Sequence, residues 1–395
     1  MKPLSTKIAG VVESATIAIS NKAKAMQRAG TDVISLSIGE PDFDTPKHIR
    51  DACIDALNRG ETHYAPSNGI PELTKAISEK IAMENGFSCT PSQVIVACGA
   101  KDAIYEACEA VLNPGDETIL LTPAWVSYEP CVQIAGGKVV KHAVNQKTFQ
   151  LDDSVLEKVN GKTKMIIVNS PSNPSGAVFD EKSMKLVADL CTDHDLYAIS
   201  DEIYEKMVYG KEHISLASIG DMARRTITIN GFSKAYAMTG WRIGYAAGPE
   251  PLIRAMAKVM SQSTSNATSI SQYAVVEALN GPQDFIPKHN AIFKERRDLC
   301  VSMLNQAKGL KCPKPEGAFY VFPSCEGAMG RTAPSGKKLA TDEDFVTELL
   351  ETEGVAVVHG SAFGLGPAFR VSYATATTSL KEACERIQRF CGNLR

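Results

Sequence analysis

The feature that most constrains the fold is a regular alternation, from about residue 90 onward, between short apolar runs and helical patterns. Runs this short, rich in Ile and Val and separated by helices, are typical of a mostly parallel sheet covered on both faces. Five runs fit the pattern, namely QVIVAC, ETILLT, KMIIV, LYAIS and TITIN. We therefore predict a large α/β domain at about 45–285.

The pattern changes after this region. A long charged helix, KHNAIFKERRDLCVSMLNQ, is followed by the runs GAFYVFPSC, GVAVVHG and AFRVSYAT and then by a closing helix. These elements predict a smaller α+β domain over 286–395. Residues 1–44 contain their own helical stretch, AISNKAKAMQRAG, and are predicted to form an N-terminal arm and part of the small domain. A chain of 395 residues is long enough for two such domains.

Composition narrows the functional classes. The net charge is −3 with Lys and Arg spread along the chain, which does not favour a nucleic-acid surface. The sequence contains no apolar run that could span a bilayer, and the opening MKPLSTKIAG lacks the apolar stretch of a secretory signal. Eleven cysteines without a CxxC pair, and seven histidines without HExxH, favour reduced thiols, a cytoplasmic location and no metal site.

Ligands of parallel α/β sheets bind beyond the carboxyl ends of the strands, so the residues that follow each run are the candidates. Gly99, Ala100 and Lys101 follow the first run and open a helix, which suits an anion or simply a tight turn. Trp125 follows the second run and is either a core residue or a surface on which a flat ring stacks. Asn173, in the NSPSNPSG loop, is either a turn former or an amide donor to a ligand.

The last two runs end in ionisable groups. Asp201 closes a strand where a carboxylate needs a cationic partner, with Tyr204 three residues on; the alternative role of Asp201 is to cap a helical turn. Lys234 lies in a loop of small residues, which favours a desolvated, nucleophilic amine; the alternative is an ordinary surface lysine. Ser233 and Arg242 offer donors suited to a phosphate.

Taken together, these groups match the needs of pyridoxal 5′-phosphate. This cofactor requires a lysine amine, a carboxylate for its ring nitrogen, donors for its phenolic oxygen, a stacking aromatic and a phosphate site. The sequence therefore predicts a pyridoxal-phosphate enzyme.

The order and spacing of the motifs also resemble a known family. The stretches GEPDFDTP, YAPSNGIPELTKAI, NSPSNPSGAV, SDEIYE, SKAYAMTGWRIGY and FRVSYAT resemble class I, fold-type I pyridoxal-phosphate aminotransferases, in particular the bacterial aspartate and aspartate/prephenate subgroup. The resemblance implies a seven-stranded, mostly parallel sheet in the large domain. It also implies a homodimer with shared active sites and a cofactor site made of Lys234 (the Schiff-base lysine), Asp201, Tyr204, Asn173, Trp125, Ser233, Arg242, Gly99, Ala100, Lys101 and, from the neighbouring subunit, Tyr64.

The resemblance further implies how substrates bind. Arg370 matches the arginine that grips the substrate α-carboxylate, and Gly39 matches a backbone contact to the same group; Trp125 and Asn173 also face the substrate. Taken alone, Arg370 would be a strand-face charge and Gly39 a turn glycine. Lys101 and Thr16 resemble the pair associated with the distal carboxylate of acidic substrates. The serine-rich segment 261–269 is either a contribution from the second subunit or a polar loop at a helix start.

The implied reaction is a ping-pong transfer of the amino group of L-aspartate to 2-oxoglutarate. Prephenate-using relatives often carry Lys-Pro before SAT, where this chain has Val12 and Glu13, so the prephenate reading is weakened. Aromatic or alanine aminotransferases and β-eliminating lyases would keep the same motifs. A nicotinamide dehydrogenase would need a glycine fingerprint that the sequence does not have, and a cofactor-binding regulator would need an attached DNA-binding module.

Overall fold

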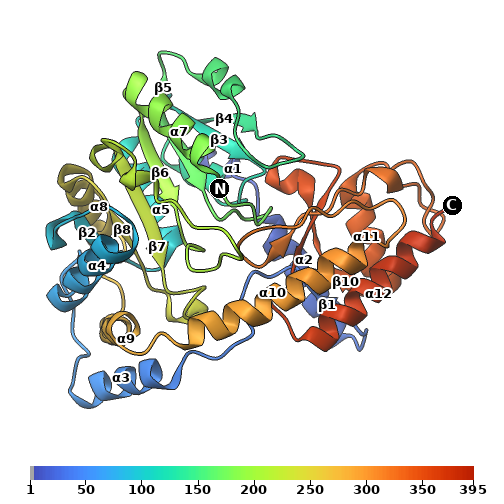
Figure 1. Ribbon diagram of the computed structural model, residues 1–395, viewed down its shortest axis with the longest axis horizontal. Helices are drawn as coiled ribbons and strands as arrows, with labels where there is room; N and C mark the ends of the chain where they lie inside the picture. Colours follow the sequence, from blue (N-terminus) through green and yellow to red (C-terminus); the bar gives the residue numbers. More distant parts are fainter. Residues whose placement is uncertain (1–3) are drawn as a thin grey trace.

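A computed structural model describes residues 4–395 and contains a seven-stranded sheet in the order β2-β8-β7-β6-β5-β3-β4 (Figure 1). β3 pairs in parallel with β4 and β5, and the parallel pairing continues through β6 to β7. Only β8 runs against its neighbours β2 and β7. The strands are β2 Val94–Ala97, β3 Glu117–Thr122, β4 Lys138–Ala143, β5 Thr163–Asn169, β6 Tyr197–Asp201, β7 Thr226–Gly231 and β8 Gly244–Ala247. The predicted mostly parallel α/β sheet is confirmed.

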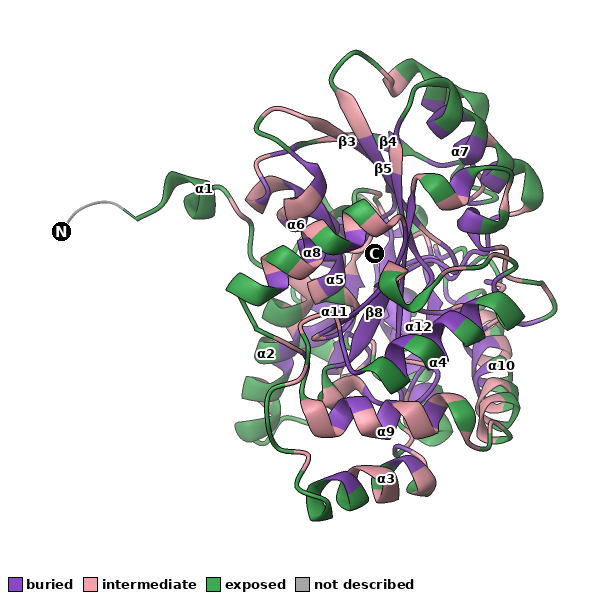
Figure 2. Ribbon diagram, turned by 90° about the vertical axis from the view of Figure 1, so that its left-hand side faces the viewer, coloured by how far each residue is buried: buried purple, intermediate pink, exposed green. Residues whose placement is uncertain are grey.

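Helices cover both faces of this sheet, as the apolar runs predicted. One face packs against α5, α6 and α8, and the other against α4, α7 and α9. Figure 2 shows the strands buried between these layers. The helices are α3 Lys47–Asn58, α4 Pro71–Glu84, α5 Ala100–Val111, α6 Tyr128–Ile134, α7 Glu181–Asp193, α8 Glu250–Gln262 and α9 Ser269–Asn280.

The C-terminal part has its own buried core, in which α10, α11 and α12 pack around short strands. In Figure 1, α10 runs from the sheet-containing lobe into this second lobe. β1 of the N-terminal stretch pairs in parallel with β10, and α2 contacts β10 and β11, so this part of the stretch packs on the C-terminal part. The elements are α1 Thr6–Ala9, α2 Ala15–Arg28, β1 Ile34–Ser35, α10 Phe285–Leu304, β9 Tyr320–Val321, α11 Asp342–Glu353, β10 Val355–Ala356, β11 Val358–His359, β12 Phe369–Ser372 and α12 Thr377–Asn393. The domain boundaries at 44/45 and 285/286 stay predictions.

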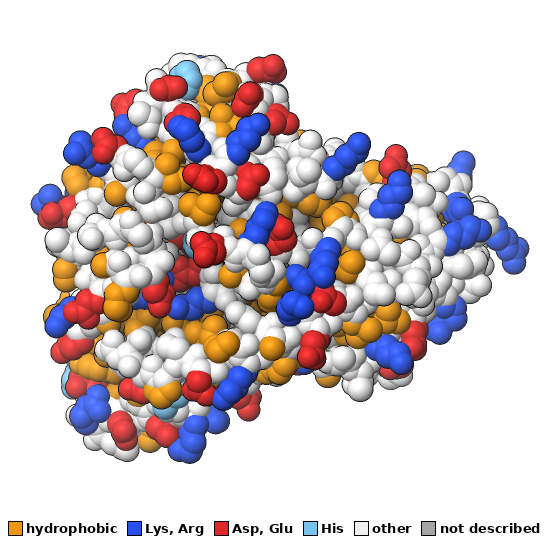
Figure 3. All heavy atoms as spheres, viewed as in Figure 1, with side chains coloured by type: hydrophobic (Ala, Val, Ile, Leu, Met, Phe, Trp, Pro, Cys, Tyr) orange, Lys and Arg blue, Asp and Glu red, His pale blue; other side chains and the backbone are white. Residues whose placement is uncertain are grey.

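No helix within residues 4–395 combines the length and apolarity needed to cross a bilayer. On the face drawn in Figure 3, acidic and basic side chains are interspersed.

Glu106 is a buried acid that the fold leaves without a partner. It lies on α5 with none of its surface exposed, and neither carboxyl oxygen has a hydrogen-bond partner among the described residues. Burial, and secondarily the charge of Asp102, raises the pKa of Glu106 to about 9. The folded protein therefore holds this carboxyl protonated, whereas the unfolded chain ionises near pH 4.5.

We expect Glu106→Gln to stabilise the protein increasingly as the pH rises. Well below pH 4.5 both side chains are neutral in the folded and the unfolded state, so the two proteins should melt alike. Between pH 4.5 and about 9 the glutamate ionises only in the unfolded wild type, and this lowers the free energy of the unfolded state. The melting temperature of the wild type should therefore fall below that of the variant. Glu109→Gln, on the same helix but less buried, is the control. A pH-independent difference would show that the carboxyl is not protonated in the fold.

Candidate active site

A cavity of about 290 Å³ lies where the carboxyl ends of β5, β6 and β7 face the second lobe. It brings together residues that are more than 350 positions apart in the sequence, from Thr16 to Arg370. The predicted residues that line it are Thr16, Gly39, Ala100, Lys101, Trp125, Asn173, Asp201, Tyr204, Ser233, Lys234, Arg242 and Arg370. Two predicted residues, Gly99 and Tyr64, do not line it.

Lys234 lies in the loop that follows β7, and its side chain enters the cavity. Its Nζ donates a hydrogen bond to the carbonyl oxygen of Gly39 at 2.7 Å. Desolvation, and then the nearby Arg370 cation, lower the pKa of the Lys234 amine to about 8. The amine is therefore partly unprotonated near neutral pH, as a nucleophile or base requires, and this lysine is not a surface side chain.

Asp201 is the last residue of β6 and is buried. Its Oδ2 accepts from the Tyr128 hydroxyl at 2.6 Å, and its Oδ1 accepts from the backbone N–H of Ile203 at 3.2 Å. Burial raises the pKa of Asp201 to about 6, and the Tyr128 hydrogen bond opposes this rise. Asp201 thus accepts from the backbone of the turn that follows β6 and also lines the cavity, while its pairing with a cation stays a prediction. Its hydrogen-bond partners are neutral, which leaves it able to pair with a cationic ligand group.

Arg370 is a fully buried cation on β12. Its Nη1 donates to Asn173 Oδ1 at 2.9 Å, and its Nη2 donates to the carbonyl oxygen of Ser37. Its Nε has no partner, and no carboxylate lies within ion-pair distance among residues 4–395. A buried guanidinium without a counter-ion is costly, so this geometry calls for an anionic ligand. The Oδ1 of Asn173 already accepts a hydrogen bond from Arg370, so only its Nδ2 remains to donate one to a ligand.

The start of α5 forms a cradle for an anion. Gly99 has a φ of +96°, and a Cβ there would lie 2.4 Å from Nη2 of Arg242. Arg242 is held by the carbonyl oxygens of Cys98 and Thr239, at 3.1 and 2.9 Å. Gly99 therefore makes room for Arg242 rather than lining the cavity, and the free N–H groups of the helix start add to its positive field. Buried Ser233 lies beside this cradle in the cavity wall.

The remaining predicted residues occupy the mouth of the cavity or lie outside it. Lys101 places its Nζ 5.0 Å from the centroid of the Trp125 ring. The hydroxyl of Thr16 is buried without a partner in the described part of the chain. Tyr64 is 90% exposed. Segment 261–269 closes α8 and leads into α9, and its role in binding stays a prediction.

Three polar residues of the site were missed by the sequence analysis. Tyr128 holds Asp201, and Asn169 joins two predicted residues, because its Nδ2 donates to the Asp201 carbonyl and its Oδ1 accepts from the Asn173 backbone. Tyr320 comes from β9 of the second lobe. Asn169 directly follows the predicted strand KMIIV, so it could have been found among the residues that follow each apolar run. Tyr128 and Tyr320 do not directly follow one of the five predicted strands, so the sequence carried no indication of them.

One cluster of the described residues has the spacing of metal ligands, namely Glu202, Glu205 and His213. It lies outside the cavity, and the Lys80 ammonium is already bound to Glu205. His213 Nε2 lies 3.0 Å from Glu202 Oε2. The cluster is thus an internal charge network, and the prediction of no metal site stays a prediction.

Comparisons with known proteins show the family to which the chain belongs. Residues 31–387 match the family model described as aminotransferase class I and II. The chain is 55% identical over 394 residues to a protein named probable aspartate/prephenate aminotransferase from Rhizobium leguminosarum bv. phaseoli, covering 98% of each chain. It superposes on the crystal structure of an aspartate aminotransferase from Rhizobium meliloti with a TM-score of 0.97 and 47% identity, over all of both chains.

A third match is an aspartate aminotransferase from Thermus thermophilus solved with maleate. The TM-score is 0.93 at 42% identity, over 99% of this chain and 100% of that one. These likenesses confirm the predicted fold-type I architecture and the predicted enzyme class. The chain belongs to the aminotransferase class I and II family, and it is an aminotransferase.

Proposed function

We propose that the protein is a pyridoxal-phosphate-dependent aminotransferase that transfers the amino group of L-aspartate to 2-oxoglutarate by a ping-pong mechanism. The observation that carries the proposal is the pairing of a buried, counter-ion-free Arg370 with Lys234, whose pKa is lowered to about 8. A carboxylate held by Arg370 would place an amino or oxo acid beside the Lys234 amine.

The residues present fit the cofactor. Asp201 has neutral partners and would pair with a protonated ring nitrogen, while the Tyr204 hydroxyl and Asn173 Nδ2 would hold the phenolic oxygen. The cradle of Ser233, Arg242 and the α5 start would hold the phosphate. When bound through Lys234, the cofactor supplies an electron sink that makes the substrate α-proton removable.

The chain's own residues then handle substrate and proton. Arg370 binds the α-carboxylate and fixes the orientation of the α-carbon. Once the substrate has displaced it, the Lys234 amine accepts the substrate α-proton as a general base and then donates the proton as a general acid. Both roles suit a pKa near 8. Buried Asp201, with a pKa of about 6, is mostly ionised near neutral pH, so it would keep the ring nitrogen of the cofactor protonated, and that cation would offset the developing negative charge.

Two features support a dicarboxylic substrate. Lys101 is a cation at the cavity mouth that is exposed to solvent and has no carboxylate partner among the described residues; partial desolvation by the surrounding protein lowers the pKa of its ammonium. The unpartnered Thr16 hydroxyl lines the same cavity. The relatives named as aspartate aminotransferases, one of them solved with maleate, support the same choice.

We expect Lys101→Ala to reduce kcat/KM for aspartate roughly 30-fold, because a distal carboxylate would lose its cation. Alanine and phenylalanine have no such carboxylate, so the variant should use them within about threefold of the wild-type rate. Lys185→Ala, an exposed lysine paired with Asp189, is the matched control. An equal loss for all donors would assign Lys101 to the cofactor rather than to the substrate.

Prephenate is the second candidate substrate. The Rhizobium leguminosarum relative is named for both aspartate and prephenate, which favours it. Val12 and Glu13 are exposed and precede Thr16, which lines the cavity. They stand where prephenate-using relatives often carry a Lys-Pro pair, and this difference argues against prephenate. Measuring kcat/KM over a panel of amino acids and oxo acids that includes prephenate decides between these substrates and an aromatic or alanine preference.

The proposal includes a homodimer with shared active sites. Tyr64, predicted to reach the partner's phosphate, is 90% exposed and therefore available to a second copy. In Figure 2 the N-terminal stretch with α1 extends away from the body, and it exposes the apolar side chains of Leu4, Ile8 and Val12, which a second copy could cover.

We also propose a cytoplasmic location, which the eleven free thiols support.

Reduction with borohydride tests the proposal directly. The purified protein should be yellow, and after reduction and digestion the pyridoxyl group should lie on the peptide that contains Lys234. A label on another lysine, or no label after incubation with pyridoxal 5′-phosphate, would refute the proposal.

A further inference from the structure

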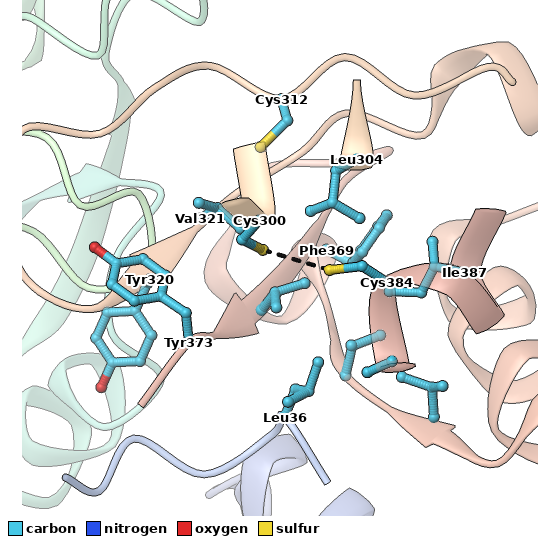
Figure 4. Close-up of a cluster of buried hydrophobic side chains, with 14 of the residues drawn as sticks. Leu36, Cys300, Leu304, Cys312, Tyr320, Val321, Phe369, Tyr373, Cys384 and Ile387 are labelled. Atoms are coloured by element: carbon cyan, nitrogen blue, oxygen red, sulfur yellow. Dashed lines mark hydrogen bonds between the residues drawn. The ribbon is translucent and has the colours of Figure 1, made fainter. Parts of the chain in front are cut away.

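Tyr320 connects the second lobe to the centre of the site. It lies on β9 and is 1% exposed, at one end of the buried cluster drawn in Figure 4. Its hydroxyl oxygen lies 2.8 Å from that of Tyr204, which comes from the turn after β6. This hydrogen bond joins a small-lobe strand to a residue that we propose touches the cofactor.

The hydrogen-bond capacity of Tyr204 sets the direction of this bond. A phenol has one proton to donate and lone pairs that accept. Burial raises the pKa of both phenols, so both keep their protons near neutral pH. If Tyr204 donates its proton to the phenolic oxygen of the cofactor, it can only accept from Tyr320. Tyr320 must then be the donor.

Two more contacts fix Tyr320 in place. Its hydroxyl packs on Gly39, where an added Cβ would lie only 1.9 Å from the Tyr320 oxygen. The guanidinium carbon of Arg370 lies 4.8 Å from the centroid of its ring, in the range of a cation–π contact. One side chain thus supports the residue that would hold the substrate carboxylate and the residue that would hold the cofactor oxygen.

We infer that Tyr320 is a positioning residue whose hydroxyl donates to Tyr204, so that the Tyr204 proton points into the cavity, while its ring supports Arg370. The inference rests on the proposed function. A phenol that accepts a hydrogen bond becomes a stronger donor, so Tyr320 increases the stabilisation that Tyr204 gives to a negatively charged ligand oxygen.

The test uses Tyr320→Phe, which removes the hydroxyl and keeps the ring under Arg370. In the cofactor-bound enzyme without substrate, the pH midpoint of the visible absorbance change should rise by roughly half a unit, because the ligand oxygen loses stabilisation in its charged form. For aspartate, kcat should fall about fivefold while KM stays within about twofold, because the Arg370 contact is kept.

Tyr373→Phe is the matched control. Tyr373 lies on the neighbouring strand segment, is fully buried, and donates to the Ala318 carbonyl oxygen at 3.0 Å, outside the cavity lining. It should lower the melting temperature about as much as Tyr320→Phe does, without moving the absorbance midpoint. In a Tyr204→Phe background, Tyr320→Phe should add no further shift, because its effect passes through Tyr204.

An unchanged or lowered midpoint in Tyr320→Phe would overturn the inference, as would an equal shift in the Tyr204→Phe background. Failure of the proposed function is a different result, since the wild type would then show no Lys234 label and no absorbance titration at all.

Discussion

Replacement of Lys234 by alanine will reduce transamination of aspartate by at least about 10⁴-fold. The variant loses the amine that bonds to the cofactor and the base that moves the substrate α-proton. It keeps the cradle of Ser233, Arg242 and the α5 start, so pyridoxal 5′-phosphate should still bind non-covalently. The loss should therefore appear in kcat and not in cofactor retention.

The measurement combines single-turnover absorbance with cofactor content after dialysis. Borohydride should leave no pyridoxyl label at position 234 of the variant. Lys185→Ala, which removes an exposed lysine that pairs with Asp189, should behave as the wild type does. Turnover of aspartate by Lys234→Ala at the wild-type rate would assign the base to another residue.

The strands that the sequence predicted and those it missed differ in one physical respect. The five predicted strands are continuous apolar runs, since both of their faces are buried. β4 lies at the sheet edge, and its buried and exposed positions interleave through Lys138, Lys141 and His142. β8 is the short run GYAA, whose small residues fit between two close neighbours. Neither pattern resembles a buried parallel strand.

The residues of the site likewise fall into those that the sequence could locate and those that it could not. Residues at the ends of predicted strands, such as Asp201 and Asn173, could be located because the strand ends share one edge of the sheet. Tyr128 reaches Asp201 from α6, and Tyr320 reaches Tyr204 from the other lobe. Such contacts depend on how lobes and helices pack, and strand-end spacing in one sequence contains no information about them. Arg370 was found through the family resemblance alone, and its missing counter-ion became visible only in three dimensions.

Arg370 affects Lys234 as well as the substrate. Its charge is the second largest cause, after burial, of the lowered pKa of Lys234. A substrate carboxylate bound to Arg370 would cancel this charge, so we expect substrate binding to raise the proton affinity of the Lys234 amine at the moment it must act as a base. Two substitutions separate this electrostatic effect from the geometric one.

Arg370→Lys keeps a cation and loses the planar fork that binds a carboxylate through two hydrogen bonds. We expect kcat/KM for aspartate to fall roughly 10³-fold, while the pKa of Lys234 in the cofactor-free protein stays near 8. Arg370→Met removes the charge as well, so kcat/KM should fall at least as far and the pKa of Lys234 should rise above about 8. The pKa is read from the pH dependence of amine labelling at Lys234 in the cofactor-free protein.

Arg389→Met is the control for both variants, because Arg389 is an exposed arginine paired with Glu353 on the second lobe. It should change neither kcat/KM nor the labelling profile. If Arg370→Met leaves the labelling profile of Lys234 unchanged, burial alone lowers that pKa. If Arg370→Lys retains wild-type kcat/KM, the α-carboxylate is bound elsewhere, because a lysine ammonium cannot reproduce two parallel N–H···O bonds from a single planar group.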